Sequence, residues 1–121
     1  MLMWLGSSTW KYYRVNQMMK KLTQEEFEES YKQPGIVELP RTDLTGLCLK
    51  GKNLRYANLF QVNLAGVDLS SADLTNANLG NANLTRANLE GAKLLHANLS
   101  GTIMEGANLK GATMPDGIIH T

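Results

Sequence analysis

Large apolar residues recur at every fifth position over much of this chain. From Leu44 to Met114, each residue five positions after the last is Leu or Met. A period of five fits neither the 3.6-residue repeat of a helix nor the two-residue alternation of a strand. The pattern predicts fifteen consecutive five-residue units from Thr42 to Asp116. The predicted core residues at the centres of these units include Leu54, Leu59, Leu64, Leu69, Leu74, Leu79, Leu84, Leu89, Leu94, Leu99, Met104 and Leu109.

The other positions of each unit are also restricted. The residue two places before the centre is small or β-branched except at Leu47 and Lys52, and Asn or Asp precedes the centre in eleven units. If each unit forms one side of a square, four units close a coil, and coils stack at the strand spacing of roughly 4.8 Å. Asn, Asp and Gly suit the corners because they favour turns. We therefore expect an all-β solenoid, a quadrilateral β-helix of about four coils.

The units ADLTN, ANLGN, ANLTR and ANLEG, between Ala72 and Gly91, resemble the A(D/N)LXX repeat of the pentapeptide-repeat family. The resemblance implies that the β-helix is right-handed. It implies little about function, because members of one architecture have varied roles. The stretch GATMPDGIIH, from Gly111 to His120, also resembles the C-termini of cyanobacterial members.

Residues 1–41 are expected to form an N-terminal helical cap, because an open solenoid end exposes its core and its strand edges. Thr23 and Glu26 form a capping-box pattern, which predicts a helix that runs to about Tyr31. The apolar spacing upstream predicts a first helix from about Ser8 to Lys21.

Residues 117–121 are expected to form the C-terminal capping tail. The segment Pro115-Asp116-Gly117 predicts a turn, after which Ile118 and Ile119 would fold over the last coil. Both ends of the solenoid are therefore predicted to be covered.

The charge balance argues against nucleic acid as a partner. Lys and Arg number 12 and Asp and Glu 11, so the net charge of +1 provides no long-range field. Cys48 is the only cysteine, which excludes an internal disulfide and fits a reducing compartment. The N-terminus has no basic leader, and its apolar run is too short for a signal sequence. We expect a soluble, cytoplasmic protein.

No residue group in the sequence matches a catalytic or metal site. His96 and His120 have no Cys or second His at metal-ligand spacing, and no Ser-His-Asp or Cys-His grouping can be assembled. No Gly-rich loop opens a helix to hold a phosphate. We expect no enzyme activity, no metal and no cofactor.

A cluster of larger side chains is expected to form a partner-binding surface on one side of the solenoid. The residues are Arg55, Tyr56, Lys93, Leu95 and His96, with Phe60 at the start of the neighbouring side. Residues 40 apart stand two coils apart, so two members of a column lie roughly 10 Å from each other. Aromatic and basic side chains are typical of binding hot spots. The alternative is that these side chains pack on the N-terminal segment or face solvent.

The sequence favours a noncatalytic module that binds a partner protein in regulation or assembly. The family resemblance raises an alternative, a DNA mimic that interacts with gyrase, but residues 42–116 hold six basic and six acidic residues and lack the acidic surface that mimicry needs. A second alternative is a membrane-surface or dimerising role for the N-terminal segment with Trp4 and Trp10. A monomer, and a redox role for Cys48, also remain open.

Overall fold

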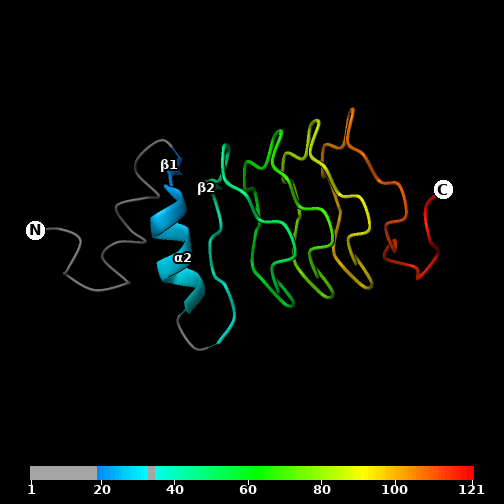
Figure 1. Ribbon diagram of the computed structural model, residues 1–121, viewed down its shortest axis with the longest axis horizontal. Helices are drawn as coiled ribbons and strands as arrows, with labels where there is room; N and C mark the ends of the chain where they lie inside the picture. The colour runs from blue at the N-terminus through cyan, green and yellow to red at the C-terminus, as the bar shows by residue number, and fades with distance from the viewer. Residues whose placement is uncertain (1–18, 33–34) are drawn as a thin grey trace, which may run out of the picture.

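The computed structural model describes residues 19–32 and 35–121. Coils stack one after another along the long axis, from the helix at one end to the C-terminus at the other (Figure 1). The assigned elements are β1 (Lys20–Lys21), α2 (Gln24–Lys32) and β2 (Thr42–Asp43). The described chain is therefore a solenoid with a short helix and a short strand at its N-terminal end.

Parallel bridges join residues 20 positions apart along the solenoid. One row contains Asn53, Asp73, Lys93 and Thr113, and the other sides carry equivalent rows. Each bridge is a single residue pair between two corners, so no side forms a long strand. The spacing of 20 is the coil length that the five-residue period predicts.

The repeat geometry begins one unit before the predicted start at Thr42. Glu38 bridges Asn58, and the Leu39 N–H donates to the Asn58 C=O at 3.0 Å. Leu39 is 3% exposed and continues the row of buried centres. The segment Val37–Arg41 has no Asn, Asp or Gly, which hid this unit from the sequence pattern.

The core is closed in the middle of the solenoid and opens toward its C-terminal end. The centres from Leu44 to Leu94 are fully or almost fully buried, and the Ala wall residues beside them are equally buried. The last four centres, Leu99, Met104, Leu109 and Met114, are only partly buried. The difference arises because the final coil has no complete layer stacked on it.

Asn and Asp make the corner hydrogen bonds that the sequence predicts. In all eleven units with Asn or Asp before the centre, its Oδ1 accepts a bond from the backbone N–H two residues later. The turn is closed by a bond such as that from the Ala57 N–H to the Leu54 C=O, at 3.1 Å. The residue before Ala57, Tyr56, has positive φ, as type II turns require of their third residue.

The predicted capping box is confirmed at the start of α2. The Glu26 N–H donates to Thr23 Oγ1 at 3.1 Å, and the Thr23 N–H donates to Glu26 Oε1 at 2.9 Å. Most of the predicted first helix, residues 8–18, lies outside the described residues. Its last two residues, Lys20 and Lys21, are not helical, because they form β1 and pair in parallel with β2.

Helix α2 lies across the first coil and bonds to its edge through side chains. Phe27 is completely buried in the core cluster. The Gln24 amide accepts from the Cys48 N–H at 2.9 Å and donates to the Cys48 C=O at 3.2 Å. The Tyr31 hydroxyl accepts from the Asn53 N–H at 2.8 Å. In later coils equivalent N–H groups, such as those of Asp73 and Asn88, bond to the preceding coil, so Gln24 and Tyr31 replace a missing layer.

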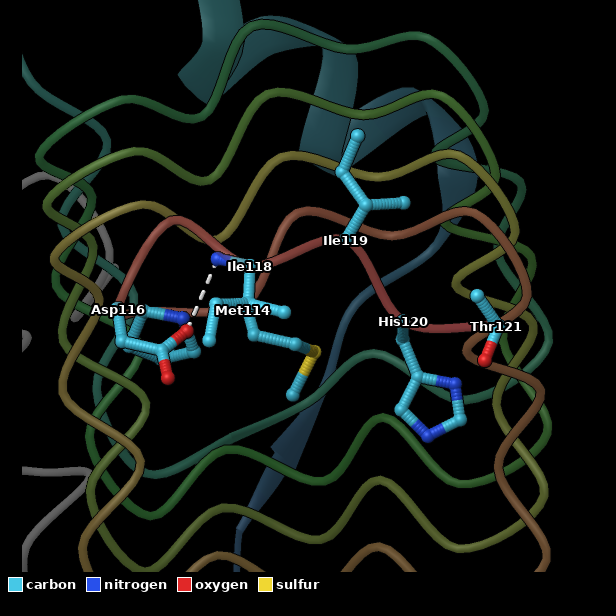
Figure 2. Close-up of a pocket in the computed structure, with 7 residues that line it drawn as sticks. Met114, Asp116, Ile118, Ile119, His120 and Thr121 are labelled. Atoms are coloured by element: carbon cyan, nitrogen blue, oxygen red, sulfur yellow. Dashed lines mark hydrogen bonds between the residues drawn. The ribbon is translucent and has the colours of Figure 1, made fainter.

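The C-terminal tail turns back, as predicted, and covers one side of the last coil. Ile119 forms an antiparallel bridge with Thr113, and the His120 N–H donates to the Ala112 C=O at 2.8 Å. Ile118 and Ile119 nevertheless remain 65% and 61% exposed, so the tail does not bury them. In Figure 2, Met114, Ile118 and His120 extend into the space that the coils enclose, and Ile119 points to the opposite side.

Position along the solenoid should decide how much a core leucine contributes to stability. We expect Leu74→Ala to lower the free energy of unfolding by about 3 kcal/mol, because it leaves a cavity in a fully enclosed layer. Leu109→Ala should cost about 1 kcal/mol, because Leu109 is only partly buried. Urea denaturation of both variants measures the difference, and equal losses would contradict it.

The corner aspartates should make stability depend on pH. Ser70 donates its hydroxyl and its N–H to Asp68 Oδ1, at 2.7 and 3.0 Å, and these bonds hold the pKa of Asp68 below its usual value. Because the pKa is lower in the folded state, this stabilisation is complete above the unfolded pKa of about 3.9 and is lost as pH falls through the folded pKa.

We expect the free energy of unfolding to fall between about pH 5 and pH 2, and to fall less in Asp68→Asn. The substitution keeps the fold, because Asn83 already accepts the same two bonds from Thr85, at 3.0 and 2.5 Å. Urea titrations at several pH values measure this free energy. If it fell as steeply with pH in Asp68→Asn as in the unchanged protein, Asp68 would not be one of the groups responsible.

Candidate partner-binding surface

Arg55 and Tyr56 lie together on one corner of the first full coil. The Arg55 guanidinium carbon lies 5.7 Å from the centroid of the Tyr56 ring, and Nη1 lies 3.5 Å from Asp73 Oδ2. Tyr56 is 52% exposed. Burial would raise the pKa of Asp73, but the bonds from Thr75 and the charge of Arg55 outweigh it and lower that pKa. Asp73 therefore stays ionised and fixes Arg55 beside the Tyr56 ring.

A groove of about 430 Å³ opens beside this pair, where α2 meets the solenoid. Tyr31 is held at its edge by stacking on Phe27, with centroids 5.7 Å apart, and by Lys52, whose Nζ lies 4.8 Å from the Tyr31 centroid. Lys52 also pairs with Glu28 at 3.0 Å. The lining residues are Tyr31, Gly35, Val37, Asn53, Arg55 and Tyr56.

Tyr31 was absent from the predicted site, because in the sequence it marks only the end of a helix. Its place in the groove follows from the docking of α2 on the first coil. The unusual Lys52 at a wall position was the available signal, since its side chain meets α2 rather than a stacked coil.

The other predicted residues are divided between two places. Lys93 and His96 are exposed on the same side as Arg55, and Leu95 is half-buried near Gly117. Phe60 lies instead against Gly80, with its ring 5.7 Å from the Arg41 guanidinium carbon, at the other end of the neighbouring side. The structure therefore brings Arg55 and Tyr56 together, places three residues further along the same side, and separates Phe60 from Tyr56.

Tyr56 and His96 occupy backbone positions that suit neither residue well. Their φ angles are 62° and 61°, and Asn76 between them has 62°. Most units place Gly or Asn at this corner, because L side chains in the left-handed region cost roughly 1 kcal/mol or more. A large aromatic kept in such a conformation and half exposed is a candidate functional residue.

Within residues 19–32 and 35–121, no group of three His, Cys, Asp or Glu side chains is placed to hold a metal ion. No helix in the same ranges is long and apolar enough to cross a bilayer. Cys48 is exposed, and its backbone bonds to Gln24. The N-terminal candidates Trp4 and Trp10 lie outside the described part of the chain.

The model of a family described as pentapeptide repeats matches the sequence in eight copies, over residues 38–76, 53–91 and 82–116. The chain belongs to the pentapeptide-repeat family. This membership identifies the solenoid as a right-handed β-helix. Among curated proteins, none matches the sequence.

Several solved structures of pentapeptide-repeat proteins are similar to this one. One from the thylakoid lumen of Arabidopsis thaliana is 28% identical, with a TM-score of 0.62, over 86% of this chain and 68% of its own. HetL, from the cyanobacterium Nostoc and involved in heterocyst differentiation regulation, is 39% identical over 75% of this chain and 45% of its own, with a TM-score of 0.44. A third, also from Nostoc, is 29% identical over 80% of this chain and 82% of its own, with a TM-score of 0.46.

If Tyr56 serves binding rather than folding, its replacement by Asn should not destabilise this pentapeptide-repeat protein. We expect Tyr56→Asn to leave the free energy of unfolding unchanged or to raise it by up to about 1 kcal/mol, because Asn tolerates positive φ. Asn76 shows that the column accepts this residue. Thermal and urea unfolding measure the change; a loss of more than about 1 kcal/mol would assign Tyr56 a structural role.

Proposed function

We propose that this pentapeptide-repeat protein is a noncatalytic module that docks a partner protein on the surface formed by Arg55, Tyr56, Lys93, Leu95 and His96. The observation that carries the proposal is Tyr56, a large aromatic that is half exposed in a strained corner conformation beside an exposed guanidinium. A regulatory or assembly role, in the cytoplasm, suits such a module.

The chemistry of this surface supports a protein as the partner. Tyr and Arg are enriched in binding hot spots, because each combines a large contact area with fixed hydrogen-bonding groups. Arg55 is already oriented by Asp73, so less side-chain entropy is lost on binding. The groove beside Tyr31 provides a concave site for a partner side chain.

The remainder of the molecule acts in this proposal as a rigid support. Four coils hold the docking residues at fixed separations along one side, and α2 caps the N-terminal end. Lys93 and His96 then lie two coils from Arg55 and Tyr56, roughly 10 Å along the solenoid axis. A partner that binds both pairs must span that distance.

Differential affinity capture tests the proposal. The intact protein, an Arg55→Ser/Tyr56→Asn variant and an Arg86→Asn control would be immobilised and exposed to native cell extract. Arg86 is a suitable control because it also combines a cation with positive φ, at 58°, on a different corner. We expect a partner that is retained by the intact protein and the control and reduced at least about tenfold by the double variant.

Circular dichroism and the unfolding free energy would first establish that all three proteins are folded. A partner captured equally by all three would remove the basis for this surface. A partner lost with Arg86→Asn alone would move the docking site to another corner.

A further inference from the structure

The C-terminal end of the solenoid carries an unused β-bridge position at Ile103. One coil earlier, the Leu84 N–H and the Ala82 C=O both bond to Ile103, at 2.7 and 2.9 Å. The equivalent groups of the last coil are the Met104 N–H and the Thr102 C=O, and neither has a backbone partner within the described chain. A residue stacked on Ile103 would satisfy both.

The tail presents the complementary pair of groups at Ile119. Ile119 faces Thr113 in an antiparallel bridge whose bonds are made by the flanking residues Ile118 and His120. In such a pair the central N–H and C=O point away from the neighbouring strand. The Ile119 N–H and C=O accordingly make no backbone bond among the described residues. They are positioned to extend the sheet by one further layer.

The side chains at Ile103 and Ile119 are also suited to contact each other, because both are apolar and exposed. Ile103 is 52% exposed and Ile119 is 61% exposed, and Ile119 points away from the enclosed space in Figure 2. Residues 101–104 and 117–119 contain no charge, so the two paired segments place no like charges directly opposite each other; Glu105 and Asp116 flank them. Open strand edges are usually protected by Lys, Pro or a bulge, and these segments have neither Lys nor Pro.

Within the described residues, the N-terminal end of the solenoid is built differently from this end. β1 pairs with β2 there, and Gln24 and Tyr31 bond to the edge of the first coil. Pairing of this C-terminal end with the same end of a second copy gives a closed two-fold dimer rather than a filament. The side that contains Ile103 lies opposite the tail-covered side, because one of the four sides, that of Asn108, lies between them along the coil.

We propose that a second copy of this chain docks on the C-terminal end to form a two-fold dimer. A two-fold axis perpendicular to the long axis of the solenoid places Ile119 of each copy over Ile103 of the other. The Ile119 N–H then donates to the Thr102 C=O of the other copy, and the Met104 N–H donates to its Ile119 C=O. These two bonds repeat the bridge that joins successive coils, and the pairing covers both exposed isoleucines.

Sedimentation velocity of the full chain, from micromolar to hundreds of micromolar concentration, tests this dimer. We expect a monomer–dimer equilibrium in which Ile103→Lys and Ile119→Lys each raise the dissociation constant at least about tenfold, because each removes the apolar contact between the two isoleucines, and a two-fold dimer contains that contact twice. Ile36→Lys is the matched control, since Ile36 is 55% exposed and lies between Gly35 and Val37, which line the groove beside α2. It should leave the equilibrium unchanged.

Hydrogen exchange provides a second readout that needs no substitution. The amides of Met104 and Ile119 should exchange more slowly at high protein concentration, whereas the amide of Leu22, which is bonded to the Asp43 C=O at the other end of the solenoid, should not change with concentration. A chain that remains monomeric throughout, or a dimer disrupted by Ile36→Lys and not by Ile103→Lys, would overturn the proposal. Arg55→Ser/Tyr56→Asn should still dimerise, so failure of the docking surface and failure of the dimer are distinguishable.

Discussion

Each coil of this protein depends on backbone bonds to the neighbouring coils. Successive coils are joined by single-residue bridges between positions 20 apart, such as Asp73 and Lys93, and each side offers only a few N–H and C=O groups to its neighbour. An unpaired buried backbone group costs about as much as a lost hydrogen bond, so a solenoid cannot simply stop. What the chain does at its two ends is therefore as important as the repeat itself.

The two ends differ in how far they meet this requirement. At the N-terminal end, the Gln24 amide supplies both a donor and an acceptor to Cys48, and the Tyr31 hydroxyl accepts from Asn53. The backbone groups of a helix are already bonded to each other, so a helix can cover a strand edge only through side chains that bond to the unpaired N–H and C=O groups. At the other end the tail pairs only with residues 111–114, and three sides of the last coil remain open. The partial burial of Leu99 and Leu109 has the same cause.

The five-residue period was sufficient to predict the coil length, the buried centres and the corner bonds, because each depends on a property that every unit repeats. The unit with Glu38 and Pro40 was missed, since it has the apolar centre but none of the polar corner residues. The groove with Tyr31 could not be derived from the sequence, because it requires the docked position of α2. The separation of Phe60 from Tyr56 depends on which corner each side chain occupies, although their places along the chain are close.

The corners explain how a binding surface can change while the fold is kept. Corner residues such as Tyr56, Arg86 and His96 share one backbone conformation, and their side chains project from the wall rather than into the core. A substitution there alters the surface at a cost of roughly 1 kcal/mol, whereas a substitution at Leu74 creates a cavity that costs several times more. Variation in surface chemistry is therefore expected to concentrate at corners. A bulky residue at a corner where Gly or Asn would have a lower conformational energy marks the position most worth testing for binding.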